Sequence, residues 1–489
     1  MDRLEPGSPA RAEPPPASQG VGADRLARAL LALALVLGLL RFVRLGHWSL
    51  WIDESLTWAD AHHGIEGGEI RNPLGYRLIA ATVDLLGGVP TEGSLRLLPA
   101  VAGWLCVPLT FLAFRGTFGA RRASLASLLV ALSSWHLYWS QNARFYTLAQ
   151  LAALVGAWIL LTALARGRGL AALLGLVVAA LAALFHPSAA LALPALALGP
   201  FLLELVQRPV APAARRASRV LALAALVGAL VAAGWALQTW RTYAYQKGQD
   251  ESLASIAHFV KTTGFFVTPL LCTALVVGAW AAWAGRRGAD LLALAVVASS
   301  LLLALCAAAF VRVSAQYVFV VLPWIALVAA FPLGREAAGP LGRRGEAAWA
   351  LVLALPALVT CGLYLTVRRG ERPAWREAYQ HVANARGPED QVFGMEASVG
   401  EYYLAPGRTD LRRPTALSWL DYFHARLPEH WAAKGRRQWF VVNPEQFAGW
   451  EPRDAADFQR FLREQCRLDA VWPLYVESRD LSVWVYRRD

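Results

Sequence analysis

Long apolar segments alternate with short polar loops from Leu26 to about Val367, and this alternation limits the chain to few folds. A transmembrane helix needs about 20 apolar residues, and this chain is 56% hydrophobic and only 17% charged. The sequence therefore predicts an α-helical polytopic membrane protein with about eleven spans. The predicted spans are residues 26–46, 95–114, 122–139, 146–165, 170–185, 188–206, 219–240, 263–284, 289–311, 317–333 and 347–367.

The net charge of +12 is carried mostly by arginine, and the arginines gather in the short loops between apolar segments. Such clusters mark cytoplasmic loops, so membrane topology explains the charge better than nucleic-acid binding does. Residues 73–88 fit either a short span or a helix lying in the membrane interface. Arg77 and Asp84 favour the interfacial helix, which also keeps the arginine-rich loops on one side. We therefore predict a multi-pass protein of a bacterial cytoplasmic membrane, with the N-terminus inside and the C-terminus outside.

Composition divides the chain into three regions. Residues 1–24 are rich in Pro, Ala, Gly and Ser, which predicts a disordered cytoplasmic tail. Residues 25–367 form the predicted transmembrane domain, with an outer loop and interfacial helices at 47–94. In residues 368–489 short helical and strand patterns alternate, which predicts a small extracytoplasmic α/β domain. Its predicted elements are Trp375–Arg386, Gln391–Met395, Gln438–Val442, Arg453–Arg467, Leu468–Val476 and Leu481–Tyr486.

An acidic pair, Asp53-Glu54, follows the first predicted span within the sequence WSLWIDES. Carboxylates beside a bilayer are costly, and those that persist often have a function. A carboxylate partly shielded from water gains proton affinity, which suits it to act as a general base. A hydrated loop pair or a helix cap is the structural alternative.

Two arginines, Arg144 and Arg312, lie on the predicted outer side, against the usual charge bias. A guanidinium there can hold a phosphate through two hydrogen bonds, although snorkelling to lipid headgroups explains Arg144 about equally well. Tyr146 and Tyr317 follow these arginines closely in the sequence. His186 precedes a proline that interrupts an apolar run, for which a helix end is the simpler explanation.

Tyr76 belongs to the segment that begins the interfacial helix, and this helix is suited to wall off a lipid-facing groove. His62-His63 with Glu66 and Glu69 form a weak metal-binding pattern, because adjacent histidines rarely share one ion. The sequence contains no P-loop, GxGxxG, GxSxG or HExxH pattern, so nucleotide-driven chemistry within this chain is not expected.

The order of these features resembles the GT-C glycosyltransferases, in particular the branch of protein mannosyltransferases and aminoarabinose transferases (family 39-like). The resemblance covers nearly all of residues 26–400. The matching stretches are WIDES, NPLGYRLIAATVDLLGG, the segment from SLRLLPAVAGW to SQNARFYTL, LFHPSA, RVSAQYVFVVLPWIAL and WREAYQHVANARGPEDQVF.

The resemblance implies the GT-C fold and an enzyme that transfers a sugar, with inversion, on the outer face of the membrane. The donor would be a polyprenyl-phosphate sugar, and the acceptor a lipid, a glycan or a protein. Asp53 matches the family's catalytic carboxylate and Glu54 its neighbour. The expected substrate-binding residues are Tyr76, Arg144, Tyr146, His186, Arg312 and Tyr317.

The chain departs from the family pattern at two places. Gln316 stands where an arginine commonly precedes the late tyrosine, and no acidic residue occurs at 144–147. No metal site or cofactor is therefore predicted, and a divalent cation is allowed but not favoured. A transporter or flippase for a lipid-linked sugar is the main alternative, but transporters place polar sites near the bilayer midplane, whereas here they gather at one face. A non-catalytic scaffold would leave Asp53-Glu54 unexplained.

Overall fold

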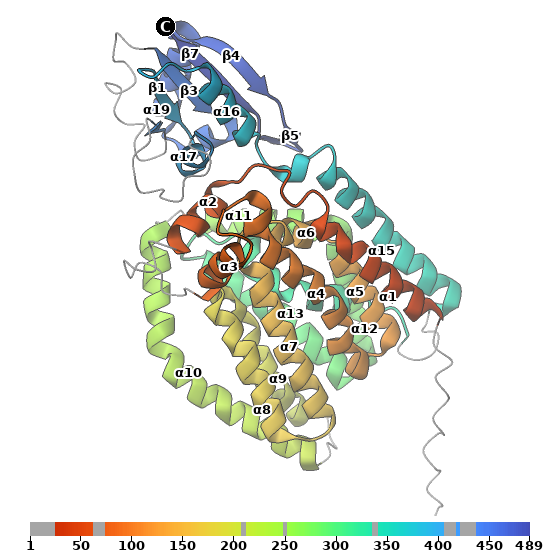
Figure 1. Cartoon of the computed structure of the whole chain (residues 1–489). Coiled ribbons are helices and arrows are strands. Elements are labelled where there is room, and N and C mark those ends of the chain that lie inside the picture. Colours follow the sequence, from red (N-terminus) through yellow and green to blue (C-terminus); the bar gives the residue numbers. More distant parts are fainter. Residues whose placement is uncertain are drawn as a thin grey trace, which may run out of the picture.

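A bundle of membrane helices carries a small sheet-containing domain at one end in the computed structural model of the chain (Figure 1). The structure describes residues 25–61, 74–206, 212–247, 252–334, 341–404, 417–420 and 437–489. The predicted disordered tail and the predicted His62-His63 pattern lie outside these residues.

The bundle consists of apolar helices joined mostly by short turns. In order they are α1 (Arg25–Gly38), η1 (Leu39–Phe42), α2 (Ile52–Ala59), α3 (Leu74–Leu85), α4 (Glu92–Phe118), α5 (Ala120–Leu132), α6 (Ser134–Ser140), α7 (Tyr146–Ala165), α8 (Gly169–Leu181), η3 (Ala182–Leu184), η4 (Pro187–Ala192), α9 (Leu193–Val206), α10 (Pro212–Lys247), α11 (Ser252–Val267), α12 (Pro269–Gly285), α13 (Gly288–Ala308), η5 (Ala315–Val321), α14 (Leu322–Ala329) and α15 (Gly342–Leu365).

The predicted count of about eleven spans is not confirmed. Five described helices are long and apolar enough to cross a membrane, and a sixth span results if α11 and α12 are counted together. These two helices meet at a 92° bend, where Thr268 has a φ of 70°. Another predicted span, 122–139, is divided at Ser133, whose extended backbone ends α5. The Ser133 side chain then caps α6 by accepting a hydrogen bond from the His136 N–H.

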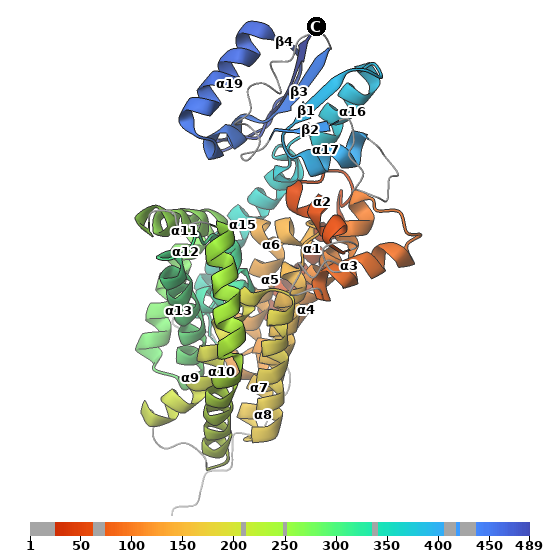
Figure 2. The same cartoon turned by 90° about the vertical axis from the view of Figure 1, so that its left-hand side faces the viewer.

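The segment predicted to lie in the interface forms α3, which has twelve residues and is too short to cross the apolar core. Helices α2 and α3 lie at the end of the bundle that faces the C-terminal domain (Figure 2). The described parts of the predicted outer loop, which include both helices, therefore face this domain.

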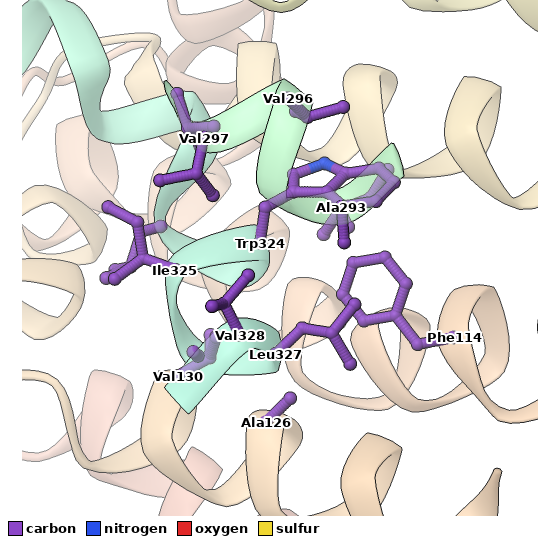
Figure 3. Close-up of a cluster of buried hydrophobic side chains, with 14 of the residues drawn as sticks. Phe114, Ala126, Val130, Ala293, Val296, Val297, Trp324, Ile325, Leu327 and Val328 are labelled. Atoms are coloured by element: carbon purple, nitrogen blue, oxygen red, sulfur yellow. The ribbon is translucent and has the colours of Figure 1, made fainter. Parts of the chain in front are cut away.

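Helix α14 lies in the centre of the bundle, and all eight of its residues are buried. It packs against α5, α12 and α13. The rings of Trp324 and Phe114 of α4 lie near each other (Figure 3). Their centroids are 4.8 Å apart. Aliphatic side chains of α13, including Val296 and Val297, belong to the same buried hydrophobic cluster.

We expect Gly278→Ala to destabilise the bundle. A Cβ atom at Gly278 of α12 would overlap the carbonyl oxygen of Val328 in α14. Overpacking of this kind costs about 1–3 kcal/mol, so the melting temperature in detergent should fall by several degrees. Gly362→Ala on α15, where a Cβ would meet no atom within 4 Å, is the matched control and should melt like the wild type. Equal melting temperatures for the two variants would contradict the close approach of α12 and α14.

Two arginines at the start of α5, next to the predicted loop between residues 114 and 122, are buried in ion pairs. Arg122 Nη1 lies 3.0 Å from Asp290 Oδ2, and Arg121 Nη1 lies 2.9 Å from Glu346 Oε2. Arg122 also donates to the carbonyl oxygen of Phe331 at 2.9 Å. These arginines therefore connect α5 to α13 and α15 through ion pairs. Their charge can also contribute to the orientation of the protein in the membrane.

The C-terminal domain is built on a five-stranded sheet in the order β2-β1-β3-β7-β4. Strands β2, β1 and β3 are parallel, whereas β7 is antiparallel to both β3 and β4. Its elements are η6 (Arg369–Glu371), α16 (Trp375–Ala385), β1 (Gln391–Gly394), α17 (Ala397–Leu404), β2 (Leu417–Trp419), β3 (Gln438–Val442), η7 (Pro444–Gly449), α19 (Pro452–Gln465), β4 (Arg467–Trp472), β5 (Tyr475–Val476), β6 (Arg479–Asp480) and β7 (Val483–Arg488).

Helices cover both faces of this sheet. Because neighbouring residues of a strand point to opposite faces, successive side chains of β3 contact different helices. Trp439 of β3 contacts His381 of α16, while the next residue, Phe440, packs against Phe461 of α19. The last two predicted elements, Leu468–Val476 and Leu481–Tyr486, correspond to strands that pair antiparallel as β4 and β7, and the small β5–β6 ribbon lies between these strands in the sequence.

Candidate active site

The acidic pair lies in the first turn of α2, and its two carboxylates have different surroundings. Glu54 is fully buried. Its Oε1 accepts hydrogen bonds from Arg96 Nε at 2.7 Å and from the Ala143 N–H at 2.8 Å, while Oε2 accepts from Arg96 Nη2 at 2.7 Å. Burial alone would raise the pKa of Glu54, but Arg96 and Arg372 hold it below its usual value.

Asp53 is only partly buried. Its backbone carbonyl accepts hydrogen bonds from Thr57 Oγ1 at 2.7 Å and from Arg144 Nη1 at 3.3 Å. Among the described residues, in contrast, no hydrogen bond or ion pair occupies the Asp53 carboxylate. This carboxylate is therefore free to interact with a substrate, whereas that of Glu54 is not.

Arg144 lies next to Asp53, in the turn between α6 and α7. Its guanidinium stands over the rings of Tyr76 and Phe145, at 5.6 and 5.0 Å from the centroids. Burial alone would lower the pKa of Arg144, but Asp53 and neighbouring tyrosines raise it. Its Nε atom is buried without a hydrogen-bond partner in the described part of the chain. A buried N–H without a partner calls for an explanation, and an anionic ligand would supply one.

Three aromatic rings continue the site away from Arg144. The rings of Tyr146 and His186 are 4.7 Å apart, and those of His186 and Tyr317 are 5.6 Å apart. Tyr317 is also within electrostatic range of Asp53 and Arg144. Helix α7, the residue that caps η4 and the short helix η5 thus contribute one ring each to a common wall.

His186 also caps a helix, as the structural alternative predicts. Its Nδ1 accepts a hydrogen bond from the Ser188 N–H at 3.3 Å, at the start of η4. The ring is therefore fixed in place while its face packs toward Tyr146.

Six of the eight predicted site residues lie near one another in this cluster: Asp53, Tyr76, Arg144, Tyr146, His186 and Tyr317. Glu54 lies beside them, but both of its oxygen atoms already accept hydrogen bonds from Arg96, an arrangement that favours a structural role over the predicted catalytic one. Arg312 is exposed in the segment between α13 and η5, and its place in a donor site stays a prediction.

Sequence reasoning missed a second acidic residue of the site, Asp60. It lies at the end of α2 and acts electrostatically on Arg144 and Tyr76, as Asp53 does. The spacing of Asp53, Thr57 and Asp60 puts all three on one face of a helix, and this signal could have identified Asp60. Among the described residues, no three His, Cys, Asp or Glu side chains are grouped to hold a metal ion.

The bundle of apolar helices with its outer domain shares the fold of solved GT-C glycosyltransferase structures. This confirms the resemblance seen in the sequence. No family of known sequences matches the chain, and no curated protein of similar sequence was found.

The solved structures with this fold include ArnT from Cupriavidus metallidurans, an aminoarabinose transferase. Its apo form is 16% identical, with a TM-score of 0.55 over 94% of this chain and 97% of that chain. The form bound to undecaprenyl phosphate is 14% identical, with a TM-score of 0.51 over the same shares. At this level of identity the likeness establishes the fold, and residue roles must come from the site itself.

Proposed function

We propose that this protein transfers a sugar from a polyprenyl-phosphate donor to a lipid, glycan or protein acceptor at the outer face of a bacterial cytoplasmic membrane. The observation that carries the proposal is the pairing of an unoccupied carboxylate, Asp53, with the partly buried guanidinium of Arg144, whose buried Nε is an unused donor. A base beside an anion-binding group is what such a transfer needs. The fold shared with ArnT bound to undecaprenyl phosphate supports this donor class.

In the proposed reaction Asp53 removes the proton from an acceptor hydroxyl. The acceptor oxygen then forms a bond to the anomeric carbon of the sugar, while the bond from that carbon to the phosphate oxygen breaks. The configuration inverts because attack and departure take place on opposite faces. The carrier leaves as polyprenyl phosphate, and Arg144 stabilises the negative charge that develops on its oxygen atoms.

The remaining residues bind and orient the donor. Tyr76 holds Arg144 from one side, and the rings of Tyr146, His186 and Tyr317 offer an apolar wall for the sugar or the first isoprene unit. Arg312, on the exposed segment before Tyr317, is proposed as a second contact to the phosphate.

Transfer is tested directly in proteoliposomes that contain undecaprenyl-phosphate hexoses labelled in the sugar, together with membrane lipids as acceptors. We expect label to appear in a new, carrier-free product. If label crosses the bilayer on intact carrier and no new product forms, the protein is a flippase and the proposal is wrong.

We expect Arg144→Lys to lower kcat/KM for the polyprenyl-phosphate donor by about 10–100-fold. Lysine keeps the charge but loses both the Nε donor and the planar group that stacks on Tyr76. Arg77→Lys, an exposed change on α3, is the control and should transfer like the wild type. Unchanged donor kinetics in Arg144→Lys would show that the donor phosphate lies elsewhere.

A further inference from the structure

We infer that the C-terminal domain completes the active site, and that Glu396 of this domain is a positioning residue that fixes the first turn of α2 beneath Asp53. The inference rests on the proposed transfer reaction. It goes beyond that reaction by giving the C-terminal domain a part in positioning the proposed base.

Side chains of the C-terminal domain bind the backbone of the outer loop immediately before Asp53. Glu396 Oε2 accepts a hydrogen bond from the Ile52 N–H at 2.7 Å. Two residues earlier, the Leu50 N–H donates to the Tyr403 hydroxyl at 2.8 Å. These N–H groups precede or begin a helix and have no partner within it, so they need acceptors from elsewhere.

The topology of the sheet explains why Glu396 reaches this position. Glu396 follows β1, and Gln446 lies in η7 after β3, so both occupy the carboxyl edge of the parallel strands. Gln446 Nε2 donates to Glu396 Oε1 at 2.6 Å, which leaves Oε2 directed to Ile52. The carboxyl edge of parallel strands is where α/β domains most often place functional side chains. Here that edge meets α2.

The backbone at Glu396 is held in a conformation that few residues adopt. Its φ is 50°, in the left-handed region that L-residues other than Asn, Asp and Gly rarely enter. The preceding carbonyl, that of Met395, accepts a hydrogen bond from the Tyr379 hydroxyl at 2.6 Å. Such conformations persist where surrounding contacts enforce them, and they concentrate at functional sites.

Asp53 is thereby fixed from two domains. The residue before it, Ile52, is held by Glu396 of the outer domain, and the residue after it, Glu54, is held by Arg96 of the bundle. A second outer contact joins the hydroxyls of Ser55 and Ser398 at 2.8 Å. Removing the outer domain's contacts would leave the helix carrying the base held on one side only.

Glu396 also titrates near neutral pH. Burial, and then the charge of Asp53, raise the pKa of Glu396 to about 7, against the opposing effects of the Ile52 N–H, Gln446 and Arg372. On α16 the other titratable group that faces it is Tyr379. Above this pH the carboxylate makes charge-assisted hydrogen bonds, which hold Ile52 more firmly than the protonated form does. Transfer should therefore rise as the pH increases through about 7.

The test compares pH profiles of sugar transfer for the wild type and Glu396→Gln. Glutamine keeps an acceptor for the Ile52 N–H but carries no charge, so kcat above pH 7 should fall about five- to tenfold and the rise near pH 7 should disappear. KM for the undecaprenyl-phosphate hexose should not change, because Glu396 does not contact the donor. The control is Glu464→Gln, an exposed carboxylate on α19, which should keep the wild-type profile.

A second measurement does not depend on activity. Hydrogen exchange at residues 50–55 should be faster in Glu396→Ala than in the wild type, because the Ile52 N–H loses its acceptor. A wild-type pH profile in Glu396→Gln, or unchanged exchange in Glu396→Ala, would overturn the inference even if transfer is established. Absence of transfer in the wild type would instead refute the proposed function, and the exchange result would still report on the contact.

Discussion

Replacing Asp53 by asparagine should lower sugar transfer by about 10²–10⁴-fold, the usual contribution of a general base. Asparagine has nearly the same shape but cannot take the proton from the acceptor hydroxyl. The fold should be unaffected, because no hydrogen bond or ion pair to the Asp53 carboxylate exists among the described residues. The measurement is the initial rate of product formation in proteoliposomes, normalised to protein content.

Two carboxylates serve as comparisons for this variant. Asp84→Asn on α3 changes an exposed group and should transfer like the wild type. Asp60→Asn changes the other acidic residue on the same face of α2 and should have a smaller effect, through Arg144. If Asp60→Asn abolished transfer while Asp53→Asn kept it, the two residues would have to exchange roles.

Local sequence was enough to single out most residues of the proposed site. Asp53, Arg144 and Tyr146 lie in short segments whose residue types are unusual for membrane loops, so they stand out without knowledge of the fold. The ion-pair partners of Glu54 could not be predicted from local sequence, because Arg96 is 42 residues distant in the sequence and Arg372 is much farther. The sequence alone does not distinguish Glu54, which has two buried arginine partners, from Asp53, which has none among the described residues.

Distance along the chain also explains why the sequence did not indicate the contact of Glu396 with the outer loop. It is 344 residues from Ile52, and only the order of the strands brings it to α2. The bend at Thr268 was missed because a hydropathy pattern reports apolar length and not the direction of the chain. Long-range pairing and local backbone geometry, rather than composition, thus limited the sequence-based predictions.

Replacing Arg96 by methionine should destabilise the protein by about 3–5 kcal/mol, the typical cost of leaving one partner of a buried ion pair alone. Arg96 is fully buried, and besides Glu54 it donates to the carbonyl oxygens of Trp48 at 2.9 Å and Ser49 at 2.8 Å. Loss of these bonds would release the segment that leads into α2. A large fall of the melting temperature in detergent, with loss of transfer at temperatures the wild type tolerates, is the expected result.

The double variant Arg96→Met/Glu54→Gln separates charge burial from packing. Because the glutamine carries no charge, the double variant should be more stable than Arg96→Met alone. Together with the single variant Glu54→Gln it completes a double-mutant cycle, which gives the coupling free energy between the two side chains.

The lowered pKa of Glu54 also predicts how the stability of the fold depends on pH. Its pKa in the folded protein lies below the ordinary value of 4.5, so it stabilises the fold above that pH and loses this contribution as the pH falls further. Between pH 5 and 3 the wild type should therefore lose more stability than Glu54→Gln. If both proteins lost equal stability over that range, another carboxylate would control acid unfolding, and the Arg96–Glu54 pair could not be what holds the turn that carries Asp53.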